Sequence, residues 1–411
     1  MLKGQFPVEK FASLRTPFYY YDLPLLRRTL DKIRECIEPY PQFHVHYAVK
    51  ANFNGKILQE ISRCGFGADC VSGGEIRAAL QNGFAPESIV YAGVGKSDEE
   101  ILLALDAGIA RFNVESAAEL EVINELALSR GVVAPVSLRV NPDIGAHTHA
   151  NITTGLAENK FGINYEQLPG VIELADSLPG VEYKGLHFHI GSQILEMDDF
   201  VALCNRINVL AEQILRQRRG RLVPAASSAA AVGYSSSAAG TAAASVLGDI
   251  NVGGGLGINY YHPNHLDVAE FSQYFETFAR HLKLPEGTPV HFELGRSVVA
   301  PCGSLISRVL YIKEGTTRRF AIIDASMTEL IRPALYKAYH RVENISSYEP
   351  EEVYDVVGPV CESSDVFAKG VSIDKCHRGD FIAIRSAGAY GESMSSQYNC
   401  RPLPACFFKE D

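Results

Sequence analysis

The amino-acid sequence predicts an α/β protein, in which a (β/α)8 TIM barrel is joined to a C-terminal antiparallel β domain that includes the N-terminal strand. Three observations support this fold class. Short apolar runs alternate with amphipathic helical patterns after residue 23, and eight of them read as strands. Polar residues suited to chemistry follow most of these runs. Beyond residue 299, strand patterns succeed one another without helices between them.

The composition describes a globular protein and excludes several classes of partner. Hydrophobic residues make up 46% of the 411 residues and charged residues 21%. The net charge of −10 argues against a nucleic-acid partner. No apolar run approaches membrane-spanning length, no signal peptide is recognised, and nine cysteines occur without a Cys-x-x-Cys motif. We therefore expect a cytoplasmic protein that binds neither nucleic acid nor membrane.

The first predicted barrel strand, residues 43–49, ends at Lys50. A lysine at the end of a buried run is unusual, because desolvation of an ammonium group is costly and lowers its pKa. A lysine with a lowered pKa attacks aldehydes, which is the property needed to hold pyridoxal phosphate as a Schiff base. A lysine that extends its amine into solvent from a strand end is the structural alternative.

The other predicted barrel strands place polar residues at one end of the barrel. The strands cover residues 67–71, 89–93, 110–114, 136–141, 184–190, 250–253 and 289–294. In TIM barrels, functional residues gather at the C-terminal ends of the strands. The residues there are Lys50, Asp69, Ser72, Asn113, Glu115, Arg139, Asn141, His187, His189, Gly253 to Gly255 and Glu293 to Arg296.

His187 and His189 close the sixth strand and are followed by Ser192. The two histidines share one face of a strand, but no acidic or cysteine residue is close in sequence, so we predict no metal site. An imidazole at the barrel mouth can instead stack on an aromatic cofactor, with Ser192 as a donor to a phosphate. Two core histidines are the alternative.

The last two barrel strands end in a glycine run and in a charged pair. Gly253 to Gly255 would let backbone amides approach an anion, and loops after strands seven and eight are the usual phosphate site of this fold. Glu293 would pair with a protonated pyridine nitrogen, and Arg296 would bind a phosphate or a substrate carboxylate. A simple tight turn and an internal Glu293–Arg296 pair remain the structural alternatives.

The sequence divides at residues 23 and 298 into an N-terminal strand, a barrel over 24–298 and a β domain over 299–411. The β domain is predicted from strand patterns, and Pro17 to Tyr21 is expected to join it. Its strands are expected at residues 304–312, 319–324, 353–357 and 380–385. Residues 221–248 are nearly all Ala, Ser and Gly, which predicts a weakly ordered excursion on the N-terminal face of the barrel, dispensable for catalysis.

The β domain carries further candidate site residues. Arg332 and Tyr336 place a cation and a phenol a few residues apart, and Cys361 stands beside Glu362 in a turn-rich loop. A cysteine can return a proton to a carbanion, because its pKa lies not far above neutrality. Most single cysteines are inert, and Tyr390 reads as a loop anchor on composition alone.

Together these motifs resemble the diaminopimelate decarboxylases, a family of fold-type III, alanine-racemase-like pyridoxal-phosphate enzymes. The resemblance runs from Pro17 to Phe408, outside residues 221–248. It rests on three motifs: Tyr47-Ala48-Val49-Lys50-Ala51-Asn52, Arg332-Pro333-Ala334-Leu335-Tyr336 and Cys361-Glu362-Ser363-Ser364-Asp365. Leu294 stands where the family usually has proline, which affects the rigidity of the loop more than its chemistry.

The resemblance implies decarboxylation of meso-diaminopimelate to L-lysine and carbon dioxide, the last step of lysine biosynthesis, with pyridoxal 5'-phosphate as cofactor. Lys50 and Cys361 are implied as catalytic residues. The implied cofactor-binding residues are Lys50, Asp69, His189, Ser192, Gly253, Gly254, Gly255, Glu293, Gly295, Arg296 and Tyr390. The implied substrate-binding residues are Arg296, Arg332, Tyr336, Glu362 and Tyr390.

The family works as a head-to-tail homodimer, so the resemblance also implies that Cys361 and Glu362 reach into the barrel of the partner subunit. Three alternatives remain open. The first is a fold-type III decarboxylase of carboxynorspermidine, arginine or ornithine. The second is an amino-acid racemase with the same cofactor. The third is a non-catalytic relative that binds a partner enzyme, although such a protein would not need both Lys50 and Cys361.

Overall fold

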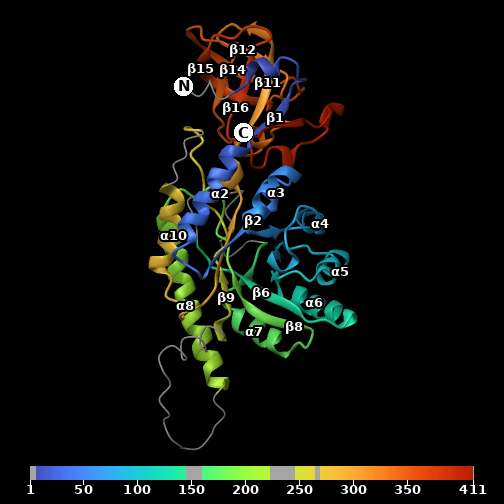
Figure 1. Ribbon diagram of the computed structural model, residues 1–411, viewed down its shortest axis with the longest axis vertical. Helices are drawn as coiled ribbons and strands as arrows, with labels where there is room; N and C mark the ends of the chain where they lie inside the picture. Colours follow the sequence, from blue (N-terminus) through green and yellow to red (C-terminus); the bar gives the residue numbers. More distant parts are fainter. Residues whose placement is uncertain (1–5, 145–159, 223–245, 264–268, 411) are drawn as a thin grey trace, which may run out of the picture.

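The computed structural model describes residues 6–144, 160–222, 246–263 and 269–410. These residues form a barrel and a second β-sheet at one end of it (Figure 1). Most of the segment predicted to be weakly ordered, residues 221–248, lies outside the described residues. Among the described residues, no helix is long and apolar enough to cross a membrane.

Eight parallel strands close into the predicted barrel, and β5 pairs with β6 to complete the ring. A further short strand, β7 (Ile163–Asn164), pairs with the end of β6. Each barrel strand overlaps one of the predicted runs, so the TIM-barrel prediction is confirmed. The strands are β2 (Phe43–Ala48), β3 (Gly67–Cys70), β4 (Ile89–Tyr91), β5 (Arg111–Val114), β6 (Ala134–Asn141), β8 (Val181–His187), β9 (Asp249–Asn251) and β10 (Val290–Leu294).

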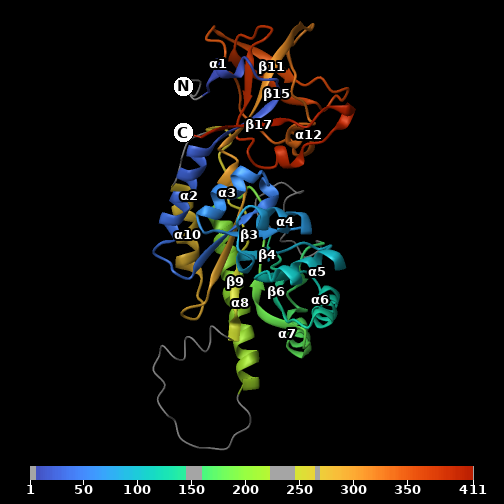
Figure 2. The same ribbon diagram turned by 45° about the vertical axis from the view of Figure 1, so that its right-hand side comes forward.

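Helices cover the outside of the barrel, as the two views of the ribbon show (Figures 1 and 2). Several begin at a side-chain cap: Ser97 accepts a hydrogen bond from the amide of Glu100, which closes a capping box at the start of α5. The helices are α2 (Leu23–Ile37), α3 (Gly55–Arg63), α4 (Gly73–Gln81), α5 (Asp98–Ala107), α6 (Ala117–Arg130), α7 (Leu168–Ser177), α8 (Met197–Leu222) and α10 (Ala269–His281).

The second sheet contains the N-terminal strand, as predicted. Strand β1 (Phe18–Asp22) pairs antiparallel with β11 and parallel with β17. Most other pairs are antiparallel, but β12 and β14 run parallel, so the sheet is mixed. Its other strands are β11 (Gly303–Glu314), β12 (Arg319–Ile323), β13 (Val342–Asn344), β14 (Glu351–Val357), β15 (Val366–Asp374), β16 (Phe381–Ile384) and β17 (Ala405–Lys409).

Three strands of this sheet were not predicted from the sequence. Strand β13 is only three residues long, and β15 is interrupted by a glycine with positive φ, Gly370. Strand β17 is recognisable only by its pairing with β1. The domain boundaries at residues 23 and 298 remain a proposal.

The second domain contacts the barrel at the turn that carries Lys50. The short helix η2 (Val49–Ala51) follows β2, and the carbonyl of Ala51 accepts a hydrogen bond from the amide of Tyr390 at 2.8 Å. The side-chain amide of buried Asn52 donates to the Tyr21 hydroxyl at 2.8 Å and to the Gly388 carbonyl at 2.9 Å. The C-terminal end of β2 is therefore fastened to the second domain.

Candidate active site

Glu293 lies buried at the C-terminal end of β10 and accepts hydrogen bonds from residues of β5, β8 and β9. Asn113 and Asn251 donate to its Oε1 at 3.3 and 2.8 Å, and His187 Nε2 lies 3.1 Å from its Oε2. Burial alone would raise the pKa of Glu293, but His187 and nearby Lys50 hold it far below the ordinary value. Glu293 is therefore a buried carboxylate that stays ionised.

The contact between His187 and Glu293 corrects one step of the sequence analysis. No acidic partner for His187 was expected, because none is close in sequence, yet β8 and β10 bring the two side chains together. Among the described residues, no group of His, Cys, Asp and Glu side chains is arranged to hold a metal ion.

Three buried polar atoms beside Glu293 have no hydrogen-bond partner among the described residues. They are Oδ1 of Asp69, Oδ1 of Asn113 and Nδ1 of His187. Buried polar atoms are rarely left unpaired, so a polar group that is not part of the chain is expected here. Burial, followed by repulsion from Glu293, raises the pKa of Asp69 well above its ordinary value.

Lys50 extends toward this carboxylate pair, with its Nζ 3.8 Å from Oδ2 of Asp69. Burial lowers the pKa of Lys50, as the sequence analysis expected, but Asp69, Tyr390 and Glu293 raise it by more. The net direction is upward, so the lowered pKa inferred from the sequence is wrong for the chain alone. The reason is that acidic groups from distant segments of the chain lie close to the amine, with Asp69 making the largest contribution.

An enclosed cavity of 50 Å³ joins these groups. It brings together residues of β2, β3 and β10, of the loops that follow β8 and β9, and of the second domain, and most of the predicted cofactor-binding residues line it. The predicted residues in its wall are Lys50, Asp69, His189, Ser192, Gly255, Glu293, Gly295, Arg296 and Tyr390.

Two amides of the glycine run have hydrogen-bond partners within the chain. The amide of Gly253 donates to Oδ1 of Asn251 at 2.9 Å, and the amide of Gly254 donates to Nδ1 of His189 at 3.2 Å. A Cβ atom on Gly254 would lie 1.8 Å from the carbonyl oxygen of Glu293. These two glycines thus allow the loop to pack against β10, and their amides have partners within the chain.

His189 is held neutral in a defined tautomer. Burial, with Lys50 nearby, lowers the pKa of His189 well below its ordinary value. Because Nδ1 accepts the hydrogen bond from Gly254, the proton of the neutral ring lies on Nε2. His189 therefore lines the cavity as a flat, uncharged ring.

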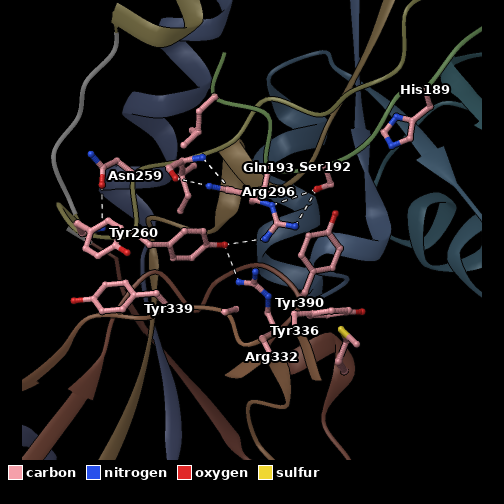
Figure 3. A pocket seen from close by; sticks show the side chains of 15 residues that line it. His189, Ser192, Gln193, Asn259, Tyr260, Arg296, Arg332, Tyr336, Tyr339 and Tyr390 are labelled. Atoms are coloured by element: carbon pink, nitrogen blue, oxygen red, sulfur yellow. Dashed lines mark hydrogen bonds between the residues drawn. The ribbon is translucent and has the colours of Figure 1, made fainter. Parts of the chain in front are cut away.

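A larger cavity of 410 Å³ opens beside the first and shares His189, Ser192, Arg296 and Tyr390 with it (Figure 3). Arg296, the first residue of helix α11 (Arg296–Val299), donates from Nη2 to Ser192 Oγ at 2.9 Å and lies over the ring of Tyr390 at 4.9 Å. The second domain contributes Arg332 and Tyr336 from helix α12 (Arg332–Tyr336). The structure thus brings these predicted substrate residues together.

The sequence analysis missed Tyr260, which lines the larger cavity, and His340, which lies behind it. The hydroxyl of Tyr260 accepts hydrogen bonds from Arg296 at 2.8 Å and from Arg332 at 2.7 Å. Nε2 of His340 lies 3.2 Å from Nη1 of Arg332, the nitrogen that also donates to Tyr260. The only sequence feature that could have indicated Tyr260 is its position a few residues after the glycine run. No sequence feature indicated His340.

Cys361 and Glu362 are exposed and line neither of these cavities. Oε1 of Glu362 accepts a hydrogen bond from the Tyr398 hydroxyl at 2.8 Å. Within one chain, these two predicted site residues are therefore separate from the other members of the site.

Comparisons with known proteins agree with this geometry. The family described as "Pyridoxal-dependent decarboxylase, pyridoxal binding domain" matches residues 26–218. The diaminopimelate decarboxylase of Bacteroides thetaiotaomicron is 56% identical over 410 residues, which cover 100% of both chains. That of Zymomonas mobilis is 39% identical over 396 residues, which cover 96% of this chain and 87% of the relative.

A comparison with solved structures also finds a diaminopimelate decarboxylase. The diaminopimelate decarboxylase from Helicobacter pylori complexed with L-lysine is 36% identical and has a TM-score of 0.86. The match covers 98% of this chain and 94% of that chain. Since the likeness extends over the barrel, the second domain and the site between them, this chain belongs to the diaminopimelate decarboxylase family of pyridoxal-dependent enzymes.

Proposed function

We propose that the protein decarboxylates meso-diaminopimelate to L-lysine and carbon dioxide with pyridoxal phosphate as its cofactor. The observation that carries this proposal is the pair of joined cavities. One holds Lys50 beside the buried carboxylate of Glu293, and the other holds the guanidinium groups of Arg296 and Arg332. The names of its relatives support the same reaction.

The smaller cavity has the residues that pyridoxal phosphate needs. Bound pyridoxal phosphate supplies an electron-withdrawing ring, which stabilises the charge left on the substrate carbon when carbon dioxide departs. Lys50 provides the amine that holds the cofactor aldehyde, and Glu293 provides an ionised acceptor for the pyridine N–H. The unpaired polar atoms of Asp69, Asn113 and His187 show that this pocket suits a polar group.

The larger cavity suits a substrate with a second carboxylate. Among the described residues, neither Arg296 nor Arg332 forms an ion pair with an acidic side chain, although both are buried. Two buried guanidinium groups without a carboxylate favour an anionic ligand that can be bound by both. Ornithine and arginine lack a distal carboxylate, so we favour diaminopimelate over those substrates.

We further propose that the enzyme is a cytoplasmic head-to-tail homodimer with shared active sites. The support is that Cys361 and Glu362 are exposed and lie outside the cavities of their own chain. In the dimer, Cys361 of the partner subunit returns a proton from its Sγ to the substrate carbon that has lost carbon dioxide. Glu362 of the partner subunit accepts a hydrogen bond from the distal amine.

The test is an absorbance spectrum of the purified protein before and after addition of meso-diaminopimelate, with carbon dioxide and lysine measured in the same sample. We expect the cofactor band to shift as lysine forms. Lys50→Ala should lose both the band and the activity, whereas Lys184→Ala, a change at an exposed lysine, should keep both. Release of carbon dioxide from ornithine, arginine or carboxynorspermidine, but not from meso-diaminopimelate, would contradict the assigned substrate.

A further inference from the structure

The phenol oxygen of Tyr260 lies between the two arginines of the larger cavity (Figure 3). It accepts a hydrogen bond from Nη1 of Arg296 at 2.8 Å and from Nη1 of Arg332 at 2.7 Å. Tyr260 is only 7% exposed, and among the described residues its hydroxyl has no acceptor for its own proton. Its oxygen therefore acts toward both guanidinium groups as an acceptor.

His340 contacts the same nitrogen of Arg332 as Tyr260 does, and its ring packs edge-on against the ring of Tyr260 at 5.1 Å. Nδ1 of His340 lies 2.8 Å from the carbonyl oxygen of Arg385, which can only accept, so Nδ1 carries the ring proton. Nε2 is then free to accept from Nη1 of Arg332 at 3.2 Å. Burial, followed by the charge of Arg332, lowers the pKa of His340 to about 3, so the ring stays neutral and keeps this acceptor.

The charges around Tyr260 explain how two buried guanidinium groups lie so close together. The charged groups that contact its hydroxyl are Arg296 and Arg332, and the His340 ring packs edge-on against the tyrosine ring. Burial raises the pKa of Tyr260, but the two arginines lower it by more, so its net direction is downward. The phenol thus carries the partial negative charge that offsets the repulsion between the two cations.

We propose that Tyr260 is a positioning residue that holds Arg296 and Arg332 at the spacing needed to bind the distal carboxylate of the substrate, with neutral His340 accepting a further hydrogen bond from Arg332. The inference rests on the proposed function, because that function supplies the carboxylate. Tyr260 acts through the arginines and leaves chemistry at the other end of the substrate unchanged. Its loss therefore weakens substrate binding more than turnover.

Kinetics of the holoenzyme with Tyr260→Phe test this inference. We expect KM for meso-diaminopimelate to rise about 10- to 100-fold with kcat changed less than about threefold, because two hydrogen bonds to charged groups are lost. The matched control is Tyr183→Phe, which removes a buried hydroxyl that donates to the Leu247 carbonyl, away from both cavities. An unchanged KM in Tyr260→Phe would overturn the inference.

A double-mutant cycle separates positioning from a general loss of structure. If Tyr260 acts through Arg332, then Tyr260→Phe should raise KM far less in an Arg332→Lys background than in the parent. If the two substitutions instead raise KM independently of each other, the proposal that Tyr260 acts through Arg332 would be overturned. The cofactor band of each variant shows whether the barrel has folded.

An ultraviolet titration gives a readout that does not need turnover. In the parent, one tyrosine should ionise at a lower pH than the others, and this step should be absent in Tyr260→Phe but present in Tyr183→Phe. If the parent fails to decarboxylate meso-diaminopimelate, the proposed function fails, whereas the titration still tests the contact of Tyr260 with the two arginines. Identical titration curves for the parent and Tyr260→Phe would then overturn it.

Discussion

Glu293 depends on its neighbours for its charge. A carboxylate buried at a strand end is costly unless hydrogen bonds and nearby cations compensate for the loss of water. Asn113 and Asn251 donate to one oxygen and His187 contacts the other, so the whole carboxylate is satisfied from inside the barrel. The chain thus maintains an anion where the cofactor's pyridine nitrogen is proposed to bind.

Replacement of this charge should lower turnover without loss of the fold. We expect Glu293→Gln to reduce kcat by about 10²–10³, the cost of removing one preorganised electrostatic group, with the fold retained because Gln has the same shape. The comparison is Glu182→Gln, at an exposed residue of β8 that pairs with Lys184. Steady-state kinetics of both variants measure this effect. A kcat for Glu293→Gln within threefold of the parent would contradict the electrostatic role of Glu293.

At the scale of elements, a hydrogen-bonded chain joins the barrel strands near their N-terminal ends, opposite the site. His46 Nε2 lies 2.9 Å from Nδ1 of His291, whose Nε2 lies 3.3 Å from Asp249. Asp249 also pairs with Arg111 at 2.6 Å, so β2, β10, β9 and β5 are linked. Burial, followed by repulsion from His291, lowers the pKa of His46 to about 3.

The low pKa of His46 predicts loss of stability in acid. The unfolded chain binds this proton near pH 6.5, whereas the folded chain binds it only near pH 3. Between these values the unfolded state holds more protons, so acidification lowers the free energy of unfolding by about 1.4 kcal/mol per pH unit for this histidine. Urea midpoints measured from pH 7 to 5 should fall less steeply for His46→Gln than for the parent. Equal slopes in the parent and in His46→Gln would contradict the prediction.

The described residues on either side of the Ala/Ser-rich segment lie at the same, non-catalytic end of the barrel. Arg218 near the end of α8 pairs with Asp176 and donates to the carbonyl of Val246 at 3.0 Å, so the residues that flank the segment are already close. We expect replacement of residues 223–245 by a Gly/Ser linker of about four residues to leave kcat within twofold of the parent, since loops of this length normally join such elements. A large fall in turnover by a folded variant would refute this expectation.

The sequence predicted the barrel well because parallel strands are buried on both faces and stand out as apolar runs. The same topology located Lys50, Glu293 and Arg296, since residues at the C-terminal strand ends must meet. It could not locate Tyr260 or His340, because these side chains meet each other and Arg332 only where the two domains pack together. The raised pKa of Lys50 escaped prediction for a related reason, as it depends on acidic groups from distant segments.

At the scale of the whole molecule, the proposed dimer makes a prediction about mixtures of variants. Lys50→Ala and Cys361→Ala should each be nearly inactive alone, Cys361→Ala by about 10²–10⁴ in turnover. After the subunits are mixed and exchanged, about one quarter of the parent activity should return, because half of the dimers are mixed and each holds one intact site. The reference for this experiment is a mixture of Lys50→Ala with Cys400→Ala, which changes another exposed cysteine.

Failure of the mixture to regain activity, with subunit exchange verified by mass, would contradict shared active sites. A fully active Cys361→Ala enzyme would instead remove the proton-donor role. The two outcomes are distinguishable because the first leaves each single variant impaired.

The pairing of β1 has a consequence for the order in which the protein is made. Strand β1 leaves the ribosome first, yet its two partners, β11 and β17, are synthesised only after the entire barrel. The barrel strands can pair before β1 has a partner, because each of them pairs with another barrel strand. Catalytic competence should thus arise late in biogenesis, when the last strand arrives to hold the first and the loop with Tyr390 closes over Lys50.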